Sequence, residues 1–112
     1  MAKKNPLNLN ALQLKTLTLI QALAELDGYA EPTEDGDVAI TRLPHPHGDH
    51  FHLGPWVVLS RDATGLQNPA PWAALERKGL IKGSFPDELV LTHAGRIYDT
   101  GLKDEILHGA DH

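Results

Sequence analysis

The residues best suited to chemistry are four histidines gathered in one short segment. They flank a Gly48-Asp49 pair at alternate positions, two on each side: His45, His47, His50 and His52. Imidazole nitrogens are good ligands for divalent transition metals such as Zn²⁺ and Ni²⁺. The segment therefore predicts either a Zn²⁺ or Ni²⁺ site or a solvated turn whose histidines have no specific role. In neither interpretation does the chain require a cofactor.

The same segment contains the string H-x-H-x-D-H, which resembles the metal-binding signature of the metallo-β-lactamase superfamily. Carried over to this chain, the resemblance implies one metal ion on His45 and His47 and a second on Asp49 and His50. That fold needs a longer chain and further ligands from later strands, and here the only later histidines are His93, His108 and His112. We therefore expect no enzyme of that superfamily.

A β-hairpin over residues 38–60 is the element expected to position the four histidines. Gly48-Asp49 has the residue types of a two-residue turn. Side chains alternate along a strand, so the histidines share one face and most apolar residues of both arms share the other. Pro44 and Pro46 suit an edge strand, because proline has no N–H to donate to a partner. The resulting cross-strand pairs are His47 with His50 and His45 with His52.

Three helices and one further strand are expected around this hairpin. An apolar period of 3.6 residues indicates the first helix. Asn68 and Thr92 have the residue type that caps the start of the other two, Gly79 ends the second, and the third carries Ile97 and Tyr98 inward. A strand at 88–92 is expected to join the hairpin, and one or two further helical turns lie within residues 102–108. The expected helices span about 10–27, 70–78 and 93–99.

The segment after the hairpin carries a family resemblance. Leu75-Glu76-Arg77-Lys78-Gly79-Leu80-Ile81, followed by Leu91-Thr92-His93-Ala94-Gly95-Arg96, resembles the recognition-helix end, wing and following helix of winged-helix domains. In that family the phrase runs Leu-Glu-x-x-Gly-Leu-Ile … Leu-Thr-x-x-Gly-Arg. The resemblance covers residues 10–27 and 72–98, with 88–92 as a wing strand. The middle of the chain departs from it, with a hairpin where such a domain has its second helix.

A small basic cluster lies at the end of the second helix and around the wing. Winged-helix domains contact DNA phosphates with such residues, so the resemblance implies DNA contact here. The same residues also suit a protein partner or an ordinary charged surface. Fifteen acidic against ten basic residues give a net charge of −5, which argues against non-specific nucleic-acid binding. The cluster consists of Arg77, Lys78, Lys82 and Arg96.

Length and composition set the outer bounds of the interpretation. The 112 residues suit a single α+β domain over 1–112, with a flexible tail at 1–8 and a frayed end at 109–112. The absence of cysteine excludes disulfides, Cys-ligated zinc and a thiol nucleophile. No signal peptide or membrane segment is recognisable, so we expect a cytoplasmic protein that does not bind membranes.

The function expected from these patterns is not catalytic, because no acid, base and nucleophile converge in the sequence. We expect a winged-helix-like interaction module of regulatory or adaptor type, with DNA binding as its more specific version. Its partner is DNA or a protein, including a second copy of the chain through its first or last helix. The alternative is a small, histidine-rich, metal-responsive protein that binds a divalent ion.

Overall fold

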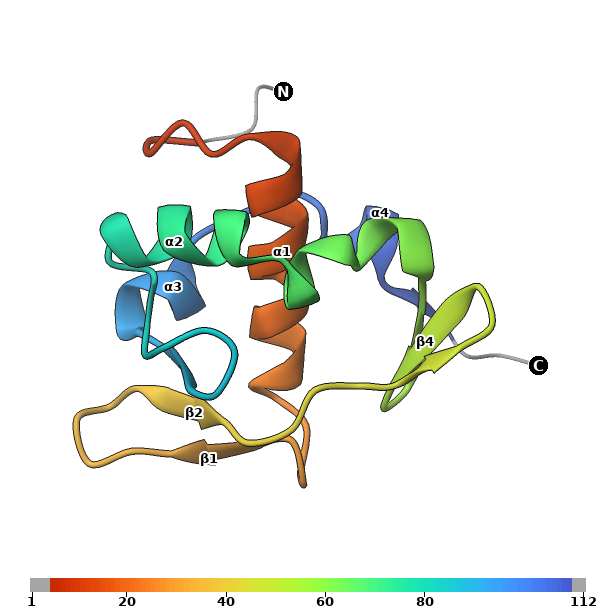
Figure 1. The fold of residues 1–112 in the computed structure, drawn as a ribbon, viewed down its shortest axis with the longest axis horizontal. Helices are drawn as coiled ribbons and strands as arrows, with labels where there is room; N and C mark the ends of the chain where they lie inside the picture. The colour runs from red at the N-terminus through yellow and green to blue at the C-terminus, as the bar shows by residue number, and fades with distance from the viewer. Residues whose placement is uncertain (1–4, 110–112) are drawn as a thin grey trace.

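Helix α1 (Ala11–Leu23) runs through the middle of the fold, and the other elements are arranged around it (Figure 1). The computed structural model describes residues 5–109, apart from the side chains of Pro46 and His47. This part of the chain is α+β, with four α-helices and two small antiparallel sheets. The further elements are β1 (Ala30–Pro32), β2 (Val38–Ile40), β3 (Pro46–His47), β4 (His50–Leu53), β5 (Trp56–Leu59), the 3₁₀ turns η1 (Ser60–Asp62) and η2 (Thr64–Gln67), α2 (Pro69–Arg77), β6 (Ile81–Lys82), β7 (Leu89–Leu91), α3 (His93–Ile97), α4 (Lys103–Ile106) and β8 (His108–Gly109).

Helix α1 begins as its capping chemistry predicts and ends earlier than expected. The Asn10 side chain accepts a hydrogen bond from the Gln13 backbone N–H, and the Gln13 side chain accepts one from Asn10 N–H. The expected span of 10–27 is wrong at its end. Helix α1 ends at Leu23, and tighter turns follow it. Leu26 there packs so closely on Gly54 that a Cβ on Gly54 would lie 2.6 Å from Leu26 Cδ2.

One sheet joins segments from both halves of the chain in the order β1-β2-β7-β6. Strand β2 pairs antiparallel with β7, so that Val38 lies opposite Leu91. Strand β6 pairs with the other edge of β7, which places Ile81 opposite Leu91 as well. The strand expected at 88–92 is therefore present as β7, and it holds the β6–β7 hairpin against the segment that follows α1.

The second sheet has the order β3-β4-β5-β8 and corrects the expected hairpin over 38–60. Its tip is confirmed, because the Gly48-Asp49 turn pairs His47 with His50 on an edge strand. Its length is wrong: β2 belongs to the other sheet, and β4 turns at Gly54-Pro55 to pair with β5. This second turn places Val58 opposite Phe51, so Val58, rather than Val57 or Leu59, is fully buried.

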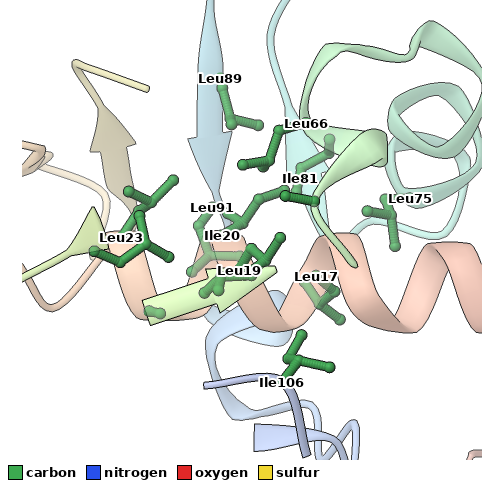
Figure 2. Packing of buried hydrophobic residues seen from close by; sticks show 14 of the residues in the cluster. Leu17, Leu19, Ile20, Leu23, Leu66, Leu75, Ile81, Leu89, Leu91 and Ile106 are labelled. Carbon is green, nitrogen blue, oxygen red and sulfur yellow. The ribbon is translucent and has the colours of Figure 1, made fainter. Parts of the chain in front are cut away.

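The core forms where α1 meets both the second half of the chain and the C-terminal segment. Figure 2 shows Leu66, Ile81 and Leu91 on one side of α1, with Ile106 on the opposite side. Leu17, Leu19, Ile20 and Leu23 of α1 are each fully buried. An α-helix buried on two sides explains why apolar residues of α1 extend beyond a single stripe.

Helix α2 shows the expected start and stop signals. The Asn68 side chain accepts from Ala70 N–H, and Pro69 occupies the first helical position. At the other end Gly79 has φ +75°, its N–H donates to Glu76 O, and Leu80 N–H donates to Leu75 O. These two bonds form a Schellman ending, in which glycine takes the left-handed conformation at little cost. The ending turns Leu80 back beneath α2.

Helix α3 is correctly predicted at its start and too long at its end. The Thr92 side chain accepts from Gly95 N–H, as expected of a cap. The helix ends at Ile97 rather than 99, and Ile97 faces outward with 69% of its surface exposed, which corrects the expectation that it points inward. Tyr98 is half-buried. The helical turns expected within 102–108 are present as α4, and Ile106 and Leu107 are buried.

The two chain ends make defined contacts where the structure describes them. Asn5 bonds through its side chain to both backbone groups of Leu9, and Leu7 N–H donates to the Tyr98 hydroxyl. At the other end β8 pairs with β5 through Gly109. Residues 1–4 of the expected tail and 110–112 of the expected frayed end lie outside the described residues.

Candidate functional site

Two regions at opposite ends of the fold are candidates for a functional site (Figure 1). One is the histidine hairpin, defined as β3, β4 and the turn between them. The other is the α3 groove, a surface hollow beside α3 that is described below. Helix α1 separates them, so the two candidate sites are independent of each other.

His50 and His52 lie side by side on the outer face of β4. The burial of this strand alternates, with Phe51 and Leu53 buried on the inner face and the two histidines half-buried on the outer one. Their Nε2 atoms are 3.2 Å apart, and their rings meet edge to face at 81° with centroids 4.9 Å apart. At this distance one Nε2–H donates to the other Nε2.

Asp49 orients the first of these imidazoles. Its Oδ1 atom lies 3.2 Å from His50 Nδ1, within hydrogen-bond and ion-pair distance. A carboxylate only accepts, so Nδ1 carries the proton in this bond and Nε2 is left with its lone pair in the neutral ring. The turn residue Asp49 therefore sets the tautomer of His50.

Two of the four predicted metal ligands are brought together by their side chains. His45 is exposed where the chain enters β3, and His47 is paired with His50 through the backbone, while its side chain lies outside the described residues. Among the side chains that the structure describes, no group of three or more His, Cys, Asp or Glu could hold a metal ion. The four-histidine site stays a prediction, and the described geometry supplies a pair.

The predicted basic contact residues have separate local roles. Lys82 Nζ lies 2.7 Å from Asp37 Oδ2, and Asp37 Oδ1 accepts from the His93 backbone N–H. The hydrogen bond from Lys82 holds the pKa of the Asp37 carboxyl below its usual range, and the same bond raises the pKa of Lys82. Lys82 therefore helps to tie β6 to the start of β2 and of α3.

Lys78, Arg77 and Arg96 are the other predicted contact residues. Lys78 Nζ donates to the Leu7 carbonyl at 2.8 Å and so connects the end of α2 to the N-terminal segment. Arg77 is exposed on α2, next to Glu76. Arg96 lies on α3 and lines a shallow hollow of about 270 Å³ together with Glu25. Whether the four residues bind DNA or a protein stays a prediction.

The surface between α2 and the β6–β7 hairpin is mixed in charge. A hollow of about 150 Å³ is lined there by Trp72 and Phe85, whose rings meet edge to face at 4.7 Å. Glu76 and Glu88 line the same hollow, and the Lys82 charge is paired with Asp37. Two carboxylates beside one paired lysine give little attraction for a phosphate backbone.

The α3 groove is a strongly apolar hollow on the surface. Its volume is about 470 Å³, and Lys78 and Asp99 are its charged lining residues. Ile97 projects beside it. Sequence reasoning missed this groove, since it placed Ile97 in the core. One signal in the sequence was available: only a few residues separate the Thr92 cap from Gly101, which indicates that α3 is short. The apolar lining consists of Pro6, Leu7, Leu80, Ala94, Ile97 and Tyr98.

Comparisons with known proteins add no relative to this description. No protein-family model, curated protein or solved structure was found to match the chain. Among residues 5–109, no helix is long and apolar enough to cross a membrane.

Proposed function

We propose that this protein is a non-enzymatic interaction module of winged-helix-like architecture, regulatory or adaptor in type, which pairs with a second copy of itself through the α3 groove. The observation that carries the proposal is Ile97, which is 69% exposed beside an apolar groove. Large aliphatic side chains on such hollows mark protein interaction sites more often than scattered surface residues do.

The order of elements supports the winged-helix part of the proposal. Helix α2 ends at a glycine stop, the β6–β7 hairpin follows as a wing, and the Thr92-capped α3 comes next. The family phrase predicted this order from Gly79 and Thr92. The stretch between α1 and α2, where such a domain has its second helix, instead holds the histidine hairpin, β5 and the 3₁₀ turns η1 and η2. A second small sheet is the departure from that architecture.

A second copy is the proposed occupant because the groove carries features that a two-fold contact can match. It offers a projecting side chain and a hollow on the same surface, so a two-fold contact lets each Ile97 enter the other copy's groove. It also offers one cation and one anion, Lys78 and Asp99, which such a contact can place opposite one another.

The expected contribution of Ile97 follows from its exposure. Burying an isoleucine side chain fully is worth about 1.5–3 kcal/mol, and about two thirds of this one remains to be buried. With one Ile97 from each copy, the pair contributes about 2–4 kcal/mol to dimerisation. A change of that size alters the dissociation constant by roughly 30- to 1,000-fold.

DNA binding is the less favoured version of the module. The surface of α2 and the wing carries Glu76 and Glu88, and Lys82 is already paired with Asp37. A mobility-shift assay on mixed-sequence DNA tests it at about 50 mM salt, where electrostatic affinity is high. A shift that disappears in an Arg77→Ala/Lys82→Ala variant would favour DNA over a second copy as the partner.

Sedimentation velocity tests the dimer directly. The wild-type chain, Ile97→Asp and the control Gln67→Asp are compared over a range of about 1–200 µM. Gln67 is exposed on η2, so the control adds the same charge outside the groove. We expect concentration-dependent dimers for the wild type and the control and monomers for Ile97→Asp. All three should melt alike at concentrations low enough for the wild type to be monomeric. A wild-type monomer throughout, or a dimer that Ile97→Asp leaves intact, would refute the proposal.

A further inference from the structure

We propose that His50 and His52 form a binding site for one divalent transition-metal ion of the zinc class. Their Nε2 atoms are 3.2 Å apart. Two imidazole nitrogens that each lie about 2.0–2.1 Å from a tetrahedral zinc ion are separated by roughly 3.3 Å. The two rings therefore already hold their nitrogens at a chelating distance. Because His52 Nε2–H is the donor between them, binding moves this proton through solvent to His52 Nδ1 and rotates the rings, without a movement of the strand.

Asp49 prepares His50 for this role. Its carboxylate bonds to His50 Nδ1, which places the proton of the neutral ring there and makes Nε2 the nitrogen that can bind a metal ion. A carboxylate behind a metal-bound imidazole is a common arrangement, because it fixes the ring and makes the ligand nitrogen more basic. Asp49 is a positioning residue here, and 96% of its side chain is exposed, so its effect is screened by solvent.

The strand beneath the pair is held in place from three sides. Strand β4 is paired with β3 on one edge and β5 on the other, and Phe51 and Leu53 are buried on its inner face. A rigid support reduces the entropy lost when the two imidazoles bind an ion. The outer face stays accessible, so water molecules can complete the coordination.

Two protein ligands predict binding that is measurable but moderate. We expect a dissociation constant in the micromolar range, with Ni²⁺ and Zn²⁺ both accepted because the ligands are imidazoles. The site does not depend on the proposed dimer, since the histidine hairpin and helix α3 lie on opposite sides of α1 (Figure 1). The two proposals can therefore fail separately.

Isothermal titration with Zn²⁺ at pH 7.5 tests the site. The full chain carries Ile97→Lys throughout, so that zinc cannot act by bridging copies at the groove and no new carboxylate lies one helical turn from His93. We expect one ion per chain, and at least tenfold weaker binding in His50→Ala and in His52→Ala. Asp49→Asn keeps an oxygen acceptor but loses the charge, and we expect binding about three- to tenfold weaker. His93→Ala is the control, because His93 is exposed on α3.

A second measurement uses the unsubstituted rings, in case either alanine variant fails to fold. Imidazole carbon–proton resonances are followed by NMR while Zn²⁺ is added. We expect the His50 and His52 signals to shift together and those of His93 and His108 to stay in place. The proposal is overturned if the His50→Ala/His52→Ala variant binds zinc as tightly as the parent, or if the His93 signal moves at the same zinc concentration as that of His50.

Discussion

Gly95 allows the start of α3 to lie directly against the turn that follows α2. A Cβ at this position would lie 2.1 Å from Leu80 O and 2.6 Å from Leu91 Cδ1. That is about 1 Å closer than the ~3.3 Å of even a favourable C–H···O contact. The Gly95→Ala variant must therefore push α3 away from Leu80, which also forms a wall of the α3 groove.

The cost of this displacement can be worked out from the surrounding bonds. The Thr92 hydroxyl lies 2.7 Å from Gly79 O and 3.0 Å from Leu80 O, and Gly95 O accepts from Gln21 Nε2 at 2.8 Å. Overpacking costs about 1–3 kcal/mol, and straining the shared Thr92 hydroxyl bond and the Gln21 bond adds about 1 kcal/mol each. Alanine recovers about 1 kcal/mol of helix propensity. The net loss of stability is about 2–4 kcal/mol.

Thermal unfolding followed by circular dichroism measures this loss. For a chain of this size, 2–4 kcal/mol lowers Tm by roughly 8–16 °C. Gly79→Ala is the first control, because Gly79 has φ +75° and a Cβ there would meet no atom within 4 Å, so only its backbone is strained, by about 1 kcal/mol. Gly109→Ala is the second control, because a Cβ there would meet no atom within 4 Å and its backbone is not in the left-handed region. Its free energy of unfolding should stay within about 0.5 kcal/mol of the wild type.

The ranking of the three melting temperatures tests whether α3 lies against Leu80. We expect Gly95→Ala to melt lowest, then Gly79→Ala, then Gly109→Ala. If Gly95→Ala melts within the range of Gly109→Ala, α3 does not lie against Leu80, and the wall of the α3 groove is not formed as described.

Two further outcomes follow from individual contacts. Asp37→Asn keeps the bond from His93 N–H but loses the Lys82 ion pair, so it lowers Tm at neutral pH. The pair lowers the pKa of Asp37 and raises that of Lys82. The difference in Tm between wild type and Asp37→Asn should therefore shrink below about pH 4, where Asp37 becomes protonated, and above about pH 10.5, where Lys82 loses its charge. A difference in Tm that does not change with pH would contradict this. Tyr98→Phe removes the hydroxyl bonded to Asn5 and Leu7 and costs about 1 kcal/mol in chemical unfolding; no change would mean that the N-terminal segment is not tied to Tyr98.

Local chemistry was enough to predict the boundaries that depend on neighbouring residues. The caps at Asn68 and Thr92, the glycine stop at Gly79 and the Gly48-Asp49 turn all involve contacts within a few positions. Each signal has one physical reason, namely a free backbone donor or a backbone angle that only glycine adopts cheaply. These signals were therefore readable without knowledge of the fold.

Long-range pairing could not be predicted in the same way. The alternating pattern continues from β2 through the histidines, although β2 pairs with β7, about fifty positions later. Nothing in the pattern of β2 distinguishes that partner from β5. The Gly54-Pro55 turn was the missed signal, and it reverses which residues of β5 are buried.

The two candidate sites also differ in how far apart along the chain their residues lie. The His50–His52 pair follows from the alternation of one strand, so sequence reasoning placed both histidines on one face. The α3 groove combines the N-terminal segment, the end of α2 and α3. Its apolar character depends on Leu7 and Ile97, whose proximity arises only when the chain is folded.

A charge exchange across the α3 groove tests whether two copies meet there in a two-fold contact. Sedimentation velocity gives the dimer dissociation constant for Lys78→Glu, for Asp99→Lys and for the double variant. If Lys78 of one copy faces Asp99 of the other, each single variant sets like charges opposite one another and weakens the dimer about tenfold or more. The double variant should bind more tightly than Lys78→Glu alone, since both lack the Lys78 bond to the Leu7 carbonyl and only the double variant restores opposite charges. The proposed contact is refuted if the double variant weakens the dimer by as much as the two single substitutions together, or if neither single substitution changes the dissociation constant.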